Sequence, residues 1–133
     1  MPDQLEGRAR DLFAAKNYAI VSVPRADGTV QTVIAWIEAE GDVLTLNSAE
    51  GRSWPANLRK AGTATVTVMA DSNPYEWASV TGRLREITTE GADDHIDALA
   101  RKYIGQDYPY RQPDETRVRI VLEPERVTYV KAD

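Results

Sequence analysis

The sequence predicts a mainly β (α+β) protein: a closed or nearly closed barrel of six or seven mostly antiparallel strands, with helices packed outside. Short runs of β-branched and apolar residues follow one another along most of the chain, and turn-forming residues separate them. Two segments, one near the N-terminus and one after residue 90, instead repeat apolar residues at helical spacing. The length of 133 residues suits one hydrophobic core, so we expect one domain over residues 1–133.

The composition argues against several kinds of site. The chain has no cysteine, which removes disulfides, thiolate nucleophiles and sulfur-ligated zinc, and no metal site is expected. A net charge of −5 argues against a nucleic-acid partner. No apolar run approaches the roughly 20 residues that span a bilayer, and the N-terminus lacks the layout of a signal peptide. We therefore expect a cytoplasmic protein without a membrane span.

The first half of the chain predicts one helix and three strands in meander order. An amphipathic helix is expected over Asp3–Lys16, because its apolar residues fall on one helical face. The strands that follow are separated by Asp-Gly and Glu-Gly-Asp turn signals. They are expected over Tyr18–Val23, Val30–Ala39 and Val43–Ser48.

The second half predicts two more helices and three or four strands. A short helix is expected over Trp54–Ala61, and a longer one over Glu90–Ile104 with acidic residues in its first turns. Strands are expected over Thr63–Met69 and Trp77–Ile87, with a loop of turn formers between them. The segment TRVRIVLEPERVTYV supplies the last one or two strands, interrupted at Pro124.

Some strands, such as YAIVSV and VIAWI, are apolar on both faces. Such strands are covered on the side away from the barrel core, either by a helix or by another subunit. We therefore expect a homodimer.

The stretch NSAEGRSWPANLRK, residues 47–60, is the first candidate site. If a helix begins here, Ser53 is placed as its N-cap and free backbone N–H groups point outward beside Gly51 and Arg52, as an anion site requires. The alternative is purely structural: Gly51 turns the chain, Ser53 caps the helix, Trp54 packs in the core and Arg52 is solvated. A second basic segment, with Arg117, Arg119 and Arg126, lies near the C-terminus.

Four segments of the chain occur in a characteristic order: DGTVQTVIAWIE, GRSWPANLRK, NPYEWASVTGRL and HIDALARKYIG. In this order they resemble the pyridoxamine 5'-phosphate oxidase-like split β-barrel family. The resemblance runs from about Leu5 to about Val130. Within the family, the chain looks most like the actinobacterial flavin- and deazaflavin-dependent oxidoreductases. This implies a homodimeric split barrel with two cofactor sites at the subunit interface, each lined by both subunits.

The resemblance also implies an activity, the transfer of a hydride from a reduced deazaflavin, coenzyme F-420, to a small conjugated organic acceptor. No catalytic acid or base is expected, because the hydride chemistry belongs to the cofactor. Two alternatives remain: the same fold using FMN, and a non-catalytic protein that binds a cofactor or another planar ligand.

Carried over by position, the resemblance implies a set of cofactor-binding residues. Near the ring system and at the end of the third strand these are Gln31, Thr32, Val33, Asn47 and Ser48. Around the phosphate and tail, and from the opposite subunit, they are Arg52, Ser53, Trp54, Asn57, Tyr75 and Trp77.

The chain departs from the family at the predicted anion site. Family members often carry basic residues at the positions of Glu50, Trp54 and Ala56, which are non-basic here. This weakens the site for a long polyglutamate tail more than for a single phosphate. Arg59 and Lys60 could compensate if they face the same groove.

Other candidates have a structural interpretation beside the functional one. His95, the only histidine, is placed one position off the apolar stripe of its helix, and we expect a structural role for it. An aromatic wall around a planar cofactor could be formed by Trp36, Trp54 and Trp77 with Tyr75, or these residues could belong to the core and to interfaces. The segment Asp107–Arg111 is interpreted as a surface loop.

Overall fold

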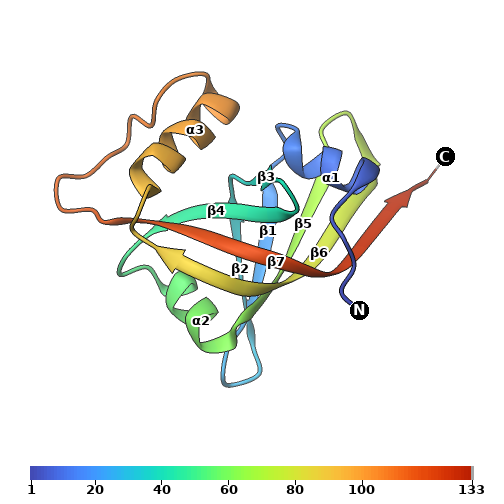
Figure 1. Cartoon of the computed structure of the whole chain (residues 1–133), viewed down its shortest axis with the longest axis horizontal. Coiled ribbons are helices and arrows are strands. Elements are labelled where there is room, and N and C mark those ends of the chain that lie inside the picture. The colour runs from blue at the N-terminus through green and yellow to red at the C-terminus, as the bar shows by residue number, and fades with distance from the viewer. Residues whose placement is uncertain (133) are drawn as a thin grey trace.

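The computed structural model describes residues 1–132, which form three helices and seven strands. The helices are α1 (Gly7–Ala14), α2 (Ser53–Ala61) and α3 (Ala92–Ile104). The strands are β1 (Ala19–Pro24), β2 (Val30–Ala35), β3 (Glu38–Glu40), β4 (Val43–Ala49), β5 (Thr63–Ala70), β6 (Asn73–Thr88) and β7 (Arg117–Lys131). Figure 1 shows the elements coloured along the chain. Within the described residues no helix has both the length and the apolar character that a transmembrane segment needs.

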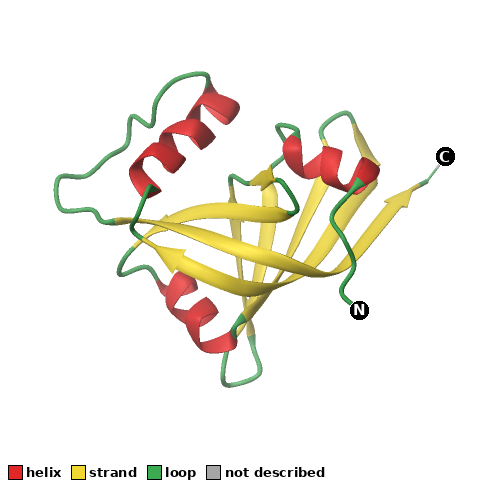
Figure 2. Ribbon diagram, in the orientation of Figure 1, coloured by secondary structure: helices red, strands yellow, loops and turns green. Residues whose placement is uncertain are grey.

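All strands belong to one antiparallel sheet in the order β2-β1-β5-β6-β7-β4-β3. Its two edge strands, β2 and β3, are joined in the sequence by only Trp36 and Ile37. The three Cα–Cα steps of this connection span at most about 11 Å, so the sheet must curl until its edge strands come close together. The predicted, nearly closed antiparallel barrel with peripheral helices is confirmed (Figure 2).

The long strands β6 and β7 pair with each other in the middle of the sheet. Their pairing slips at two bulges, between Thr81 and Gly82 and between Leu84 and Glu86. Gly82 pairs with Pro124, so the proline falls at an irregularity and does not end the strand. The predicted interruption at Pro124 is therefore a bulge within one continuous strand.

The barrel interior is filled by alternate residues of the strands, as the period-two pattern predicts. Along β5, the burial alternates so that Ala64, Val66 and Val68 face inward while the threonines between them are half-exposed. Phe13 of α1 and Leu58 of α2 are fully buried against the same core from two different helices. The core therefore holds both short helices onto the barrel.

The corner between β2 and β3 corrects the prediction of one strand over Val30–Ala39. The strand pattern continues in the sequence, but the chain leaves the ladder at Trp36 and Ile37. The Ile37 backbone N–H donates instead to the hydroxyl of Tyr103 on α3, at 3.2 Å. The hydrogen bond that a neighbouring strand would make to Ile37 is thus made by a side chain 66 residues away in the sequence.

The loop expected before Trp77 is also shorter than predicted. Strand β6 begins at Asn73, and only Asp71 and Ser72 turn between it and β5. The other predicted elements are confirmed with shifts of a few residues at their ends, within the usual uncertainty of helix and strand boundaries.

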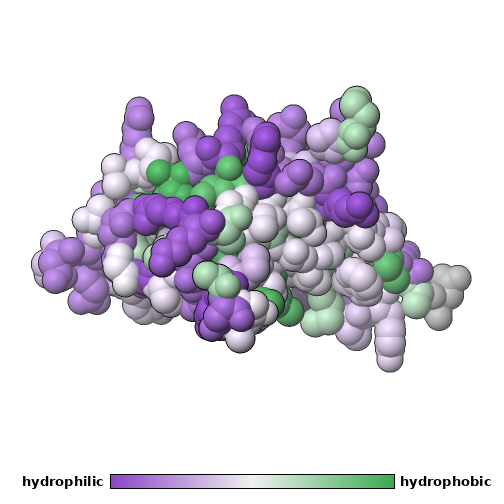
Figure 3. Space-filling view, turned by 90° about the horizontal axis from the view of Figure 1, so that it is seen from below, coloured by the Kyte–Doolittle hydropathy of each residue, from purple (hydrophilic) through white to green (hydrophobic). Residues whose placement is uncertain are grey.

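The outward face of β1, β2 and β5 carries exposed apolar side chains. Tyr18 is 56%, Ile20 42%, Ile34 66% and Met69 52% exposed. Together with Trp77 they line a groove of about 370 Å³, which we call the outer groove. In Figure 3, which shows the molecule from below, apolar residues (green) lie at several places among hydrophilic (purple) and intermediate (white) ones.

Candidate functional site

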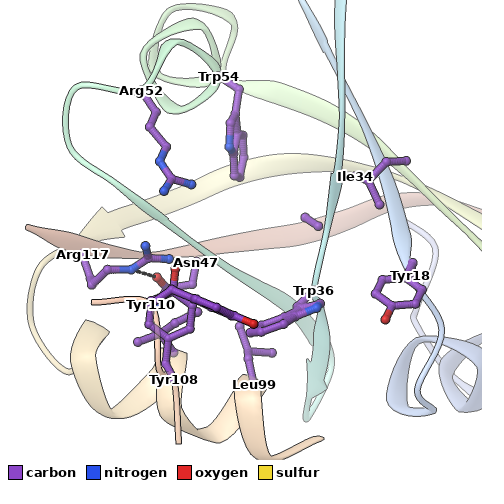
Figure 4. Close-up of a pocket in the computed structure, with 12 residues that line it drawn as sticks. Tyr18, Ile34, Trp36, Asn47, Arg52, Trp54, Leu99, Tyr108, Tyr110 and Arg117 are labelled. Atoms are coloured by element: carbon purple, nitrogen blue, oxygen red, sulfur yellow. Dashed lines mark hydrogen bonds between the residues drawn. The ribbon is translucent and has the colours of Figure 1, made fainter. Parts of the chain in front are cut away.

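A cleft of about 330 Å³ opens between the start of α2, the corner after β2, helix α3 and the loop over residues 105–116. In Figure 4, Arg52 and Trp54 project from α2 on one side, and Tyr108, Tyr110 and Arg117 face them from the other. The cleft is lined by Tyr18, Ile34, Ala35, Trp36, Asn47, Arg52, Trp54, Ile96, Leu99, Tyr108, Tyr110 and Arg117.

Two guanidinium groups give the cleft its charge. Arg117 is 5% exposed and donates from Nη1 to Glu115 Oε1 at 3.0 Å. Arg52 reaches the other oxygen of the same carboxylate, with Nη2 3.9 Å from Glu115 Oε2. One carboxylate faces two cations, so this end of the cleft keeps an excess positive charge for an anion.

The remaining walls are largely aromatic. Trp36 stacks on Tyr103 with centroids 5.5 Å apart and an interplanar angle of 7°, and its edge meets Tyr108 at 6.2 Å. The Arg117 guanidinium lies over the Tyr108 ring, 5.1 Å from its centroid. Trp54 is 7% exposed, so it belongs to the core and still lines the cleft. Flat apolar walls beside fixed cations suit a planar, conjugated anion.

The start of α2 differs from the prediction. Ser53 is the first helical residue and not the N-cap; that position is held by Arg52, which makes no side-chain cap bond. The Ser53 hydroxyl instead accepts a hydrogen bond from Gln31 Nε2 at 2.8 Å, and Asn57 Nδ2 donates to Gln31 Oε1 at 2.6 Å. The first turn of α2 therefore has neither a side-chain cap nor an acidic residue, and its backbone N–H groups remain available to an anion.

Residues 5–131 match the family model described as pyridoxamine 5'-phosphate oxidase. The chain belongs to the pyridoxamine 5'-phosphate oxidase family. The family resemblance of the four sequence segments is thereby confirmed. No curated protein matches the sequence.

Solved structures with the same fold include an F-420 reductase, which is 23% identical with a TM-score of 0.83 over 92% of this chain and 98% of that one. A conserved hypothetical protein from Mycobacterium tuberculosis is 15% identical, with a TM-score of 0.75 over 97% of this chain and 87% of that one. General stress protein 26 from Bacillus anthracis is 12% identical, with a TM-score of 0.68 over 92% and 90%. At these identities the likeness shows the split-barrel fold.

The residues carried over from this family fall into three groups. Asn47, Arg52 and Trp54 line the cleft. A second group, Gln31, Ser53 and Asn57, forms the hydrogen-bonded cluster at the start of α2. The third group does not line the cleft of this chain and consists of Thr32, Val33, Ser48, Tyr75 and Trp77.

The third group has varied surroundings. Thr32 is exposed beside Ser22, whereas Val33 packs against the core. Ser48 is fully buried, and its hydroxyl has no hydrogen-bond partner within residues 1–132. Tyr75 is 68% exposed and Trp77 lines the outer groove, so both are available to another molecule.

The hypothesis that Arg59 and Lys60 face the same groove is wrong. Arg59 forms an exposed ion pair with Glu50, with Nη2 and Oε1 2.7 Å apart, and neither basic residue lines the cleft. The second cation comes from Arg117, at the start of β7. The basic segment near the C-terminus signalled this residue, although nothing local in the sequence links it to α2.

The loop after α3 contributes to the cleft, which the interpretation of Asp107–Arg111 as a surface loop did not include. Tyr108 and Tyr110 of the segment Asp107–Arg111 line the cleft and are not merely surface residues. Arg111 holds this loop to α3 through Asp97, with Nη2 and Oδ2 2.7 Å apart. The tyrosine-rich composition of the segment was the signal for its role.

His95 lies inside the structure, which corrects its predicted position off the apolar stripe. It is 9% exposed and lies between Asn47 and Thr45 of β4, with Nδ1 3.0 Å from Asn47 Nδ2 and Nε2 3.1 Å from Thr45 Oγ1. Burial lowers its pKa to about 4, against the opposing charge of Glu40. The imidazole is therefore neutral near pH 7.

Proposed function

We propose that this family member is an oxidoreductase that binds reduced coenzyme F-420 in the cleft and reduces a small conjugated organic acceptor. The observation that carries the proposal is the pair of guanidinium groups, Arg52 and Arg117, set among aromatic walls beside an uncapped helix start. When bound, the deazaflavin supplies the hydride, and the acceptor takes its proton from water. The fold is also that of an F-420 reductase.

The residues of the chain hold and orient the ligand. Arg52 and the N–H groups of the first turn of α2 bind its phosphate, with Arg117 as the second cation. Trp36 and Tyr108 bound the space for the flat ring system. None of these groups has to gain or lose a proton during hydride transfer.

A parallel titration with deazaflavin and with FMN tests the cofactor. Ligand fluorescence is followed for wild type, Arg52→Ala and the matched control Arg59→Ala, which removes an arginine of α2 that lies outside the cleft. Arg52→Ala should weaken deazaflavin binding by about 1.5–3 kcal/mol, as loss of a charge-assisted contact does, and Arg59→Ala should leave it unchanged. Absence of binding by either ligand at tens of micromolar would exclude the proposal.

FMN is a second candidate, and the charge of the site favours it. The two guanidinium groups share Glu115, and Arg59 is engaged by Glu50, so the positive charge suits one phosphate better than a polyanionic tail. A yellow protein as purified, with a flavin absorption band, would support FMN. Binding without turnover across a panel of acceptors would instead support a non-catalytic ligand-binding protein.

We also propose that the protein is a homodimer whose second copy covers the outer groove. Tyr18 and Ile34 line both this groove and the cleft, so one apolar surface runs from the exposed sheet face into the site. A partner seated there would bring its own Tyr75 and Trp77 toward the cofactor. Ile34→Glu should give a monomer by light scattering, whereas Val30→Glu, at an exposed position outside the groove, should not.

A further inference from the structure

Arg117 is held in the cleft by the amide of Asn47, whose orientation is fixed by two partners. Arg117 Nε, which can only donate, lies 2.9 Å from Asn47 Oδ1. On the other side, Asn47 Nδ2 donates to the carbonyl of Ala92 at 2.9 Å, and a carbonyl can only accept. The amide therefore presents its oxygen to Arg117 and its nitrogen to α3.

The same amide nitrogen determines the tautomer of His95. Asn47 Nδ2 faces His95 Nδ1 at 3.0 Å, so Nδ1 must accept the hydrogen bond and the ring proton must lie on Nε2. Nε2 then donates to Thr45 Oγ1 at 3.1 Å, and that hydroxyl donates to Glu40 Oε2 at 2.6 Å. Every N–H and O–H in this series of hydrogen bonds, from Asn47 to Glu40, meets one acceptor.

We infer that His95, in its neutral Nε2–H form, is a positioning residue that fixes the guanidinium of Arg117 in the cleft through Asn47. The ligand part of this inference rests on the proposed function; the tautomer and the fixed arginine do not. A side chain with only donors at this position would force Asn47 to turn its oxygen away. Asn47 would then present N–H groups to the Nε–H of Arg117, and the guanidinium would lose one of its two hydrogen-bond partners and keep only Glu115.

Charged groups from three elements face His95. Glu40 of β3 lies 3.6 Å from Nε2 and favours protonation, and Asp94 of α3 lines a second cavity that His95 also lines. Arg117 and Arg119 of β7 oppose protonation, together with burial. That cavity has a volume of about 310 Å³ and is lined by His95 together with Glu40 and Arg119. Protonation of His95 from this cavity would break the series of hydrogen bonds between Glu40 and Arg117 at its centre.

Nitrogen NMR of the ligand-free protein tests the tautomer directly, because the chain has only one histidine and its signals need no assignment. We expect the proton on Nε2 at pH 7 and a slowly exchanging Nε–H signal from Arg117, identified by its loss in Arg117→Lys. A proton on Nδ1, or a rapidly exchanging Arg117 signal, would overturn the inference. Neither outcome depends on any cofactor.

Two substitutions separate positioning from simple packing. His95→Asn places an acceptor where Nδ1 was and should keep the slow exchange of the Arg117 signal. His95→Phe keeps a ring but removes the acceptor, so only the Ala92 carbonyl then holds the Asn47 amide nitrogen, and the Arg117 signal should exchange faster. FMN or deazaflavin, whichever wild type binds, should bind about tenfold more weakly to His95→Phe, equivalent to the loss of one buried hydrogen bond. Equal behaviour of the two variants would contradict the inference. If wild type binds neither ligand, the proposed function fails while the NMR results still decide this one.

Discussion

Removal of the Tyr103 hydroxyl should destabilise the protein more than its small size suggests. This hydroxyl joins three segments: it donates to the carbonyl of Asn17 at 2.6 Å and accepts the N–H of Ile37 at 3.2 Å. Tyr103 is 1% and Ile37 0% exposed, so water does not readily replace the lost partner. Burial raises the pKa of Tyr103 to about 12, and the hydroxyl stays protonated throughout the useful pH range.

The magnitude follows from the two backbone groups that Tyr103→Phe would leave unpaired. A buried donor or acceptor without a partner costs about 1–3 kcal/mol, so the free energy of unfolding should fall by about 2–6 kcal/mol for the two groups. The ring remains, and with it the stacking on Trp36. The loss should therefore come from the hydroxyl alone.

Urea unfolding followed by circular dichroism provides the assay. Tyr18→Phe is the matched control, because Tyr18 is 56% exposed and its ring lies 5.4 Å from that of Tyr103. We expect a lower midpoint for Tyr103→Phe with an unchanged slope, and a control within about 0.5 kcal/mol of wild type, as at most exposed sites. Equal midpoints for the two variants would refute the reasoning that this hydroxyl holds the β2–β3 corner to α3.

Three further predictions concern pH and packing. The pKa of His95 is lowered from 6.5 to about 4, so as the pH falls the unfolded chain takes up a proton on His95 before the folded protein does. The free energy of unfolding should therefore fall by about 3 kcal/mol between pH 6.5 and 4. Urea titrations of His95→Asn should lack this pH dependence. The hydrogen bond from Arg8 lowers the pKa of Glu76 to about 2, so stability present above pH 4.5 should be lost as the pH falls toward 2. Thermal melts of Glu76→Gln should lack that loss. Gly82→Ala places a Cβ 3.1 Å from Leu122 Cβ and should lower the free energy of unfolding by about 1–3 kcal/mol in urea, as overpacking does; a neutral effect would show that the bulge gives way.

The sequence predicts the fold well wherever a single local pattern decides the structure. The alternating threonines of β5 and the acidic start of α3 both agree with their tertiary surroundings. The break at Trp36 and Ile37 could not be predicted, because the apolar pattern continues across it and the Ile37 backbone is bonded by Lys102 and Tyr103, which are distant in the sequence. A strand interrupted by a distant side chain leaves no local signal.

The candidate site is predictable in part for the same reason. Arg52 lies in a stretch whose glycine, hydroxyl and basic residues predict an anion-binding site, and in the structure Arg52 lines the cleft. Arg117 reaches the same cleft from the far end of the chain, and the sheet pairing of β4 with β7 brings it beside Asn47. Such a pairing is a property of the topology and not of either segment.

For the proposed homodimer, the position of Tyr18 and Ile34 has a thermodynamic consequence, because the same side chains line the cleft and the outer groove. A ligand that binds only to the assembled pair raises the apparent association constant of the subunits, and dilution of the subunits lowers the apparent affinity for the ligand. Titrations at nanomolar and at micromolar protein should then return different dissociation constants for one ligand. In that case ligand affinity would depend on how much of the protein the cell contains.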